Sequence, residues 1–286
     1  RYNSMKPQFQ HKATTSFVMW LDHYLPSKQE AFSNKTGLFY YMEDDSMDST
    51  YYSYSSPYKQ WLTDSGVNGA EVIASVSGAG GEAYTRGSGV VFDFDNGRVL
   101  LPRSTFSKSE QLSGTFAVKD FNIYLTNETE EHLIIESKYE ANSRFSVNAS
   151  GIKPYDPVVP CVFVLSNDTQ NTPYAFGGED LTTIYYRLVV FAENLYQLDG
   201  MLSALSDAHA SSFNDVGYDI YPLNEYGDLK NSGFSYADVV RGSTDWMYID
   251  RVFSSKISKD VGAKNNPGIF LGFVDMEIAK SRFPRI

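Results

Sequence analysis

Residues 181–210, LTTIYYRLVVFAENLYQLDGMLSALSDAHA, carry the clearest indication of the fold class of this chain. Residues 181–191 are rich in β-branched and aromatic side chains, which predicts a strand. In residues 192–210 the leucines recur every three or four residues, which predicts an amphipathic helix. The residues at this spacing are Leu195, Leu198, Leu202 and Leu205. A strand that leads into an amphipathic helix indicates an α+β protein.

Helical spacing also occurs near the N-terminus, in residues 14–32. Phe17, Leu21 and Leu25 fall on one face, Pro26 ends this helical segment, and residues 27–30 offer the start of another turn. A strand is predicted at residues 37–42. Near the other end, residues 246–257 and 269–282 are predicted to form two long strands joined by the polar loop 258–268.

The middle of the chain, from about residue 67 to 164, is predicted to be a run of strands. Residues 89–94 and 98–101 alternate on either side of Asp95-Asn96-Gly97, a strong hairpin signal. In residues 115–125 the apolar residues of the alternating pattern shift from even to odd positions at Lys119-Asp120, which predicts a β-bulge. Residues 132–139 and 157–165 are predicted as two more strands. This spacing is typical of a sandwich or barrel-like module.

A tyrosine-rich segment, residues 43–58, separates the first strand from this region. It is too aromatic for a disordered linker, so we expect a long ordered loop or arm. Tyrosine is enriched at protein interfaces, and four residues are therefore candidate contacts between subunits. They are Tyr51, Tyr52, Tyr54 and Tyr58. Packing in a strand or in the core explains them equally well.

Net charge and cysteine content limit the possible functions. The net charge of −11 and the absence of a basic run argue against a protein that grips nucleic acid or an acidic membrane surface. The single cysteine, Cys161, lies in an apolar run and is expected to be a buried thiol. No apolar stretch approaches the roughly 20 residues needed to span a membrane. The expected compartment is therefore reducing: the cytoplasm, or a particle assembled there.

Motifs for chemistry are lacking in the sequence. The histidines, His11, His23, His132 and His209, show no zinc-binding spacing, and no nucleophile elbow is present. Glycine-rich segments are not followed by the residues of a phosphate loop. Carboxylates such as Glu43-Asp44-Asp45 and Glu130-Glu131 are expected to solvate the surface. We therefore predict no catalytic residue, no metal site and no cofactor.

Several segments resemble proteins of tailed bacteriophages. Residues 14–32 and 184–207, above all the FAENLYQLDGML sequence at 191–202, resemble tail-terminator and tail-completion proteins. The segment YSSPYKQW at 54–61 and the region 154–178 are similar to phage virion structural proteins. The resemblance covers about half of the chain. It implies a small sheet flanked by helices and carries over no catalytic residue.

These observations predict a β-dominated α+β fold, with a terminator-like sheet, flanking helices and an inserted β-sandwich or barrel-like region. We expect three parts: 1–66, 67–170 and 171–286, with the last joining residues 1–42 in one body. The resemblance implies a non-enzymatic ring subunit at the head–tail neck or tail end of a virion. Its expected partners are copies of itself and tail-tube, sheath or connector proteins, with DNA passing without specific binding.

Two other functions stay open from the sequence alone. One is a carbohydrate-binding β-sandwich module in a baseplate or tail, in which tyrosines stack on sugars. The other is a glycan hydrolase whose carboxylates are brought together by the fold.

Overall fold

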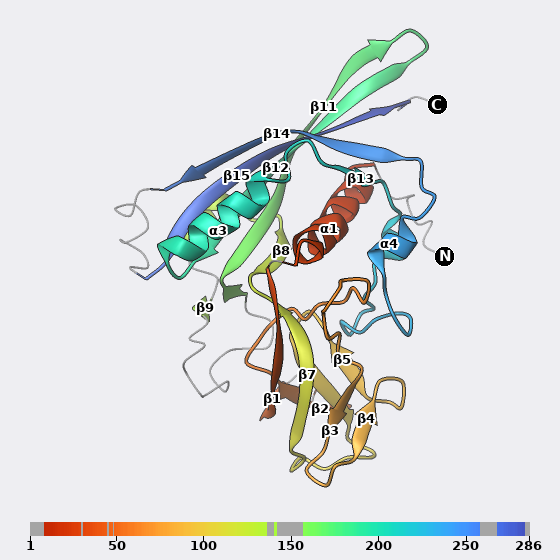
Figure 1. Cartoon of the computed structure of the whole chain (residues 1–286), viewed down its shortest axis with the longest axis vertical. Coiled ribbons are helices and arrows are strands. Elements are labelled where there is room, and N and C mark those ends of the chain that lie inside the picture. The colour runs from red at the N-terminus through yellow and green to blue at the C-terminus, as the bar shows by residue number, and fades with distance from the viewer. Residues whose placement is uncertain are drawn as a thin grey trace.

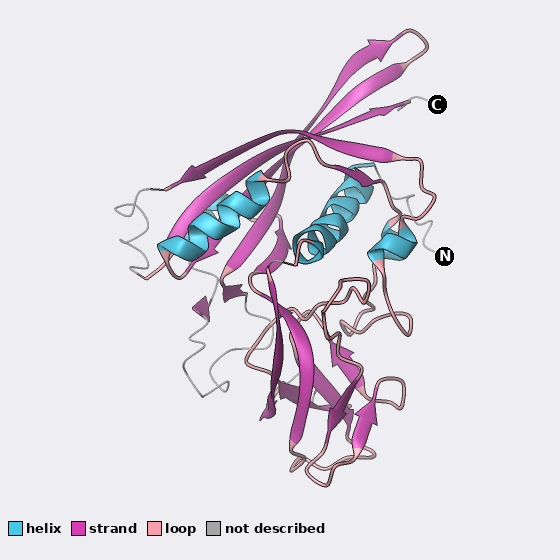
Figure 2. Cartoon of the chain, viewed as in Figure 1, coloured by secondary structure: helices cyan, strands magenta, loops and turns pink. Residues whose placement is uncertain are grey.

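The computed structural model describes residues 9–29, 31–44, 46–47, 49–135, 140–141, 157–257 and 268–283. The chain is a β-dominated α+β protein with two curled half-barrel sheets and few helices. The two sheets follow one another along the long axis of the molecule, and helices cover only one of them (Figures 1 and 2).

The six-stranded sheet forms the part with helices. Its order is β13-β14-β15-β12-β11-β8, and it is antiparallel except where β8 runs parallel to β11. Its strands are β8 (Asn122–Thr126), β11 (Cys161–Ala175), β12 (Glu179–Ala192), β13 (Ser212–Asn214), β14 (Trp246–Lys256) and β15 (Phe270–Arg282). The predicted strands at 181–191, 246–257 and 269–282 are confirmed, and most of the loop 258–268 lies outside the described residues.

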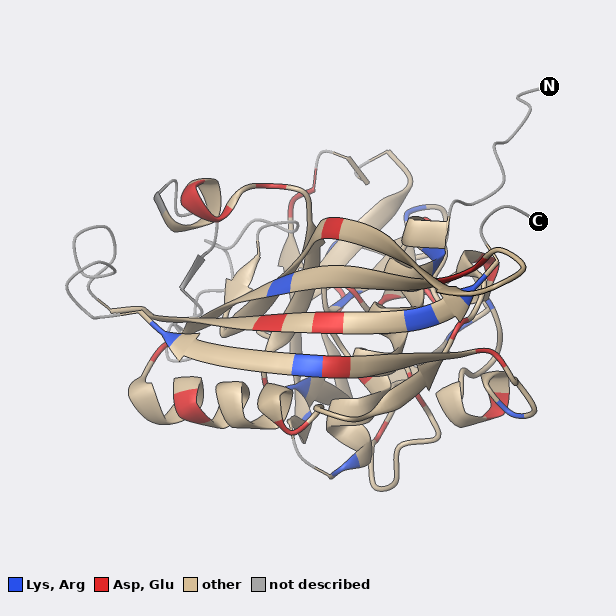
Figure 3. Cartoon of the chain, turned by 90° about the horizontal axis from the view of Figure 1, so that it is seen from above, with Lys and Arg blue, Asp and Glu red and all other residues tan. Residues whose placement is uncertain are grey.

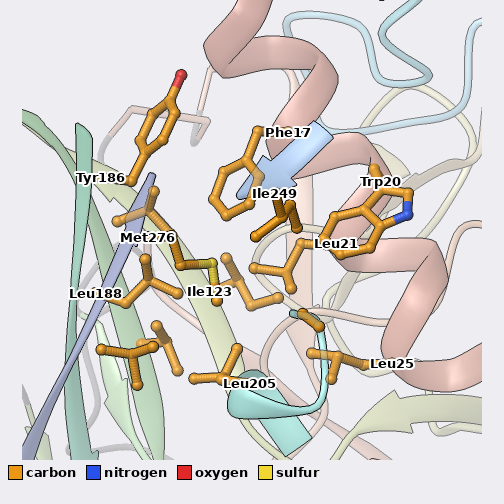
Figure 4. Packing of buried hydrophobic residues seen from close by; sticks show 14 of the residues in the cluster. Phe17, Trp20, Leu21, Leu25, Ile123, Tyr186, Leu188, Leu205, Ile249 and Met276 are labelled. Atoms are coloured by element: carbon orange, nitrogen blue, oxygen red, sulfur yellow. The ribbon is translucent and has the colours of Figure 1, made fainter. Parts of the chain in front are cut away.

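Two helices pack on one face of this sheet. These are α1 (Phe9–Ser27) and α3 (Leu195–Ser206), and Asn194 caps α3 by accepting a hydrogen bond from the Gln197 backbone N–H. Side chains of α1 and α3 meet alternate residues of β12, β14 and β15 in one hydrophobic core (Figure 4). Leu198, Leu202 and Leu205 are buried as predicted, whereas Leu195 is 48% exposed.

The seven-stranded sheet forms the rest of the molecule. Its order is β4-β3-β7-β1-β2-β6-β5, with antiparallel pairing throughout. Its strands are β1 (Phe32–Met42), β2 (Tyr51–Ser55), β3 (Ser75–Ser77), β4 (Ala83–Thr85), β5 (Val91–Asp93), β6 (Arg98–Pro102) and β7 (Leu112–Lys119). A second core, which includes Trp61 and Phe116, fills its curled interior.

The predicted hairpin around Asp95-Asn96-Gly97 is confirmed, since β5 pairs with β6 across it. Gly97 has a φ of 64°, and a Cβ at this position would lie 1.8 Å from the Tyr58 carbonyl oxygen. The turn therefore needs glycine both for its backbone angle and for the close approach of another segment.

Two sequence-based predictions are wrong in this region. The shift in the apolar pattern at Lys119-Asp120 does not mark a β-bulge. Here β7 ends in the seven-stranded sheet, and β8 begins in the six-stranded sheet. Residues 132–139 were expected to form a strand, but α2 (Glu130–Ile135) occupies the first part, and 136–139 lie outside the described residues. The neighbouring short strands β9 (Glu140–Ala141) and β10 (Val158–Val159) pair in parallel.

Polar contacts connect the two halves of the molecule. On α1, His23 Nδ1 lies 2.5 Å from a carboxylate oxygen of Asp64, whose side chain is buried. Gln60 binds the Ile123 backbone twice: its Oε1 accepts from the amide N–H at 2.7 Å and its Nε2 donates to the carbonyl oxygen at 2.6 Å. These buried contacts fix the start of β8 against the segment that follows β2.

Candidate assembly surface

A long β-hairpin projects from the six-stranded sheet. β11 and β12 remain paired out to Ala175 and Glu179, and the turn between them contains Gly177 and Gly178, both with positive φ. From residue 167 to 175, β11 is exposed on both faces. The hairpin therefore extends beyond the body as an arm, which is drawn at the top of Figure 1.

The end of this arm is apolar. Phe176 is fully exposed and Tyr174 is 67% exposed. Large aromatic side chains held in water on a projecting, hydrogen-bonded hairpin are typical of a surface that is covered in a complex. The spacing of apolar residues predicts the flanking strands but not the arm. The Gly177-Gly178 pair between them was the signal for a hairpin turn.

The six-stranded sheet has two edges that lack a further strand within the described residues. β8 covers β11 only along Cys161–Leu165, so residues 169–175 of β11 have one neighbour, β12. β13 covers β14 only at 246–248, so residues 251–256 of β14 pair only with β15. Unpaired backbone groups at a sheet edge can pair with another chain. The two edges belong to opposite sides of the sheet order.

The face of this sheet opposite α1 and α3 mixes exposed aromatic and charged side chains. Trp246, Tyr248 and Phe253 of β14 are each between 43% and 58% exposed. Charged residues of β12, β14 and β15 occupy paired positions on the same side of the sheet, and Figure 3 marks where charged residues occur along these strands. This part of the face therefore combines exposed rings with ion pairs, whereas nearer Val189 and Phe191 the same face forms a buried hydrophobic cluster with Leu133 of α2.

Arg187 is the most constrained charge on that face. Its Nε and Nη2 donate to the two Asp275 carboxylate oxygens at 2.6 and 2.8 Å, and its Nη1 donates to Glu130 Oε1 at 2.6 Å. The hydrogen bonds to Asp275 and then Glu130 raise the pKa of the guanidinium above its ordinary value. Arg187 thus connects α2 to the sheet through a bidentate fork.

The predicted contact tyrosines do not form an arm, so that expectation is wrong. Residues 51–55 form β2, an interior strand of the seven-stranded sheet, and Tyr54 is 1% exposed. Its hydroxyl donates to the Ser107 and Lys108 carbonyl oxygens, and burial raises its pKa to about 12. Tyr54 is therefore a core residue. Tyr51, Tyr52 and Tyr58 are partly exposed, and contacts through them stay a prediction.

One acidic residue expected on the surface is buried. Asp44 is 5% exposed, and its carboxylate accepts hydrogen bonds from Arg98 and from the Ser46 backbone. Burial alone would raise the pKa of Asp44, but the hydrogen bonds from Ser46 and Arg98 hold it below its usual value. Arg98 also donates from Nε to Asp93 Oδ2 at 2.7 Å, so one buried guanidinium is held between two carboxylates.

The described residues contain no group of three or more His, Cys, Asp or Glu side chains that could hold a metal ion. Cys161 is buried as predicted, and burial raises the pKa of its thiol well above the ordinary value. No helix in the described part of the chain has the length and apolar character needed to cross a membrane. A search of protein-family models and of curated proteins finds no match to this sequence.

Proposed function

We propose that this chain is a non-enzymatic structural subunit of a tailed-phage virion, which forms a ring at the head–tail neck or at the tail end. The β11–β12 arm is the observation that carries this proposal. The rings of Tyr174 and Phe176 at the end of the arm are exposed, so they bury little surface within their own subunit. The same rings would be buried on a neighbouring subunit.

The sheet edges support a ring in particular. A cyclic assembly larger than a dimer uses a heterologous interface, in which two different surfaces of identical subunits meet. The outer part of β11 and the end of β14 are two such surfaces, and they lie at opposite sides of the sheet. The first carries the exposed Asp168, and the second carries Arg251, which also pairs with Asp250 and Glu277 of its own chain.

The overall charge suits the proposed station. A net charge of −11 repels a polyanion, so DNA can pass a ring of such subunits without adhering. In this proposal the further partners are other virion proteins, such as tail-tube, sheath or connector subunits. The assembly would take place in the host cytoplasm, where the free thiol of Cys161 stays reduced.

Native mass spectrometry and electron microscopy of the purified chain test this proposal. We expect a closed ring for the wild type and a folded monomer for the double variant Tyr174→Ser/Phe176→Ser. Because these side chains are exposed, their replacement should change the unfolding free energy by only about 0.5 kcal/mol. Circular dichroism checks that the variant is folded.

Tyr196→Ser is the matched control. Tyr196 is also an aromatic residue, 90% exposed, but it lies on α3 away from the arm. This variant should assemble as the wild type does. A wild-type chain that stays monomeric at every concentration, or a double variant that still forms rings, would contradict the proposal.

A further inference from the structure

A cavity of about 560 Å³ lies between the two halves of the molecule. One wall is a stripe of α1 that includes Val18 and Asp22, and the opposite wall is the β5–β6 turn with Asp95 and Asn96. The start of β8 and residues 218–230 complete it. A volume of this size is in the range of small-molecule sites in proteins.

Part of the lining is apolar and aromatic. Val18, Ile123 and Leu125 supply aliphatic surface, and the rings of Tyr124 and Tyr218 lie beside them. The Tyr218 ring also meets the His11 ring edge to face, with centroids 5.8 Å apart. The Tyr124 hydroxyl accepts from the Val158 backbone N–H at 3.3 Å, so its polar end is already used.

Several polar groups of the cavity are also engaged. Lys119 Nζ lies 2.8 Å from Asp22 Oδ1, so these two charges compensate each other. Both polar atoms of the Gln60 side chain bind the Ile123 backbone. Lys230 Nζ donates to the Asp219 carbonyl oxygen at 3.3 Å.

Asp95 differs from these groups. Its side chain is exposed to solvent at the edge of the cavity, and within the described residues its carboxylate has no ion pair with the cavity lysines. Desolvation by the surrounding protein and the negative charges of Asp93 and Asp22 raise the pKa of Asp95 to about 6. The positive charge of Lys119 opposes this shift, and the exposure of the side chain to water limits it. Burial also raises the pKa of Tyr221, so its hydroxyl stays protonated beside the carboxylates of Asp95 and Asp22. The local field therefore disfavours the Asp95 charge and favours a cation next to it.

We propose that this cavity binds a small organic amine, with its ammonium group at Asp95 and its alkyl stem along Val18, Ile123 and Leu125. An ammonium would form a charge-assisted hydrogen bond with the Asp95 carboxylate. The faces of the tyrosine rings attract the same charge. A neutral ligand of equal shape would leave the Asp95 carboxylate uncompensated, and an anion would be repelled by Asp95, since Lys119 already compensates the charge of Asp22. This inference is independent of the proposed ring.

Isothermal titration calorimetry with 1,4-diaminobutane tests the proposal, with 1,4-butanediol as the neutral ligand of matched length. The full chain should bind the diamine and not the diol. Asp95→Asn should weaken diamine binding by about ten-fold or more, since it removes a charge-assisted contact. Asparagine is common in such turns, so this variant should fold. The matched control is Glu225→Gln, which neutralises an exposed carboxylate outside the cavity and should leave affinity unchanged.

The pH dependence of binding gives a second readout. The titratable groups that line the cavity with Asp95, or act on its pKa, are His11 and Asp22 of α1, Asp93, Lys119, Tyr124, Tyr218, Tyr221 and Lys230. With the pKa of Asp95 at about 6, binding should weaken roughly ten-fold from pH 7 to pH 5, and this dependence should be reduced in Asp95→Asn. Equal binding of diol and diamine, no diamine binding, or an unchanged affinity of Asp95→Asn would each overturn the proposal.

Discussion

Replacing Leu202 by alanine should expose how α3 is anchored to the six-stranded sheet. Leu202 is 5% exposed, and its two methyl groups lie over Gly272 of β15. A Cβ built on Gly272 would lie 3.1 Å from both Leu202 methyl groups and from one methyl group of Leu198. The leucine side chains thus occupy the space that a residue other than glycine would fill on this strand.

The expected loss follows from that geometry. A buried leucine replaced by alanine costs about 2–5 kcal/mol of unfolding free energy, and the cost rises with the volume of the cavity that remains. Here the neighbour on the sheet has no side chain that could turn into the space. We therefore expect a loss in the upper half of the range, about 3–5 kcal/mol.

Gly272 allows a sharper test than the single variant. Gly272→Ala alone should be destabilising by about 1–3 kcal/mol, because its methyl group presses on both leucines. In the double variant Leu202→Ala/Gly272→Ala the new methyl group enters the space that Leu202 leaves. The double variant should therefore lose less stability than the sum of the two single losses, by about 1 kcal/mol or more.

Urea unfolding followed by far-UV circular dichroism measures all three variants. Leu195→Ala is the control on the same helix, since Leu195 is half exposed and its loss should cost only about 0.5 kcal/mol. Additive losses in the double variant would refute the proposed contact between α3 and Gly272. So would a Leu202→Ala variant as stable as Leu195→Ala.

Three further predictions concern Cys161, Asp95 and the strand β2. Cys161 is fully buried with a raised thiol pKa, so a thiol reagent should label it only as the protein unfolds, and rapid labelling of the native chain would contradict this. The pKa of Asp95 is raised from 3.8 to about 6 in the folded chain, so ionisation of this carboxyl favours the unfolded chain. The folded chain therefore loses stability as the pH rises from about 4 to about 6. Asp95→Asn should therefore raise the melting temperature near pH 7 but not below pH 4, and equal melting temperatures near pH 7 would contradict the raised pKa. Deleting residues 46–54 removes most of β2, which pairs with both β1 and β6. We therefore expect the seven-stranded sheet to be lost, which circular dichroism would detect. A deletion variant that still folds would contradict this prediction.

The elements predicted correctly are those whose signal is local. In α3 and β12 the spacing of apolar residues follows from one buried face, and that periodicity is visible in the sequence whatever the helix or strand packs against. The β5–β6 hairpin is encoded in Asp95-Asn96-Gly97, because few residues adopt the backbone angles of such a turn.

The errors occur where the local signal has two explanations. A parity change such as that at Lys119-Asp120 arises from a bulge, but also from a chain that leaves one sheet and enters another. In the same way, the apolar residues Leu133 and Ile134 suit a strand or one turn of a helix equally well. The tyrosines of β2 suit an interface or a core, and only pairing with both β1 and β6 distinguishes the two.

The α+β class, the long strands, the amphipathic helix and the burial of Cys161 could be predicted from local sequence, because each depends on residues close together in the chain. Where these elements end, and which distant residues they bring together, depends on tertiary packing. The arm at Tyr174 and Phe176 exists because β8 stops covering β11 at Leu165, an event set by pairing between distant segments. The cavity at Asp95 likewise combines α1, a hairpin turn and β8, and no local pattern records contacts between residues so far apart in the chain.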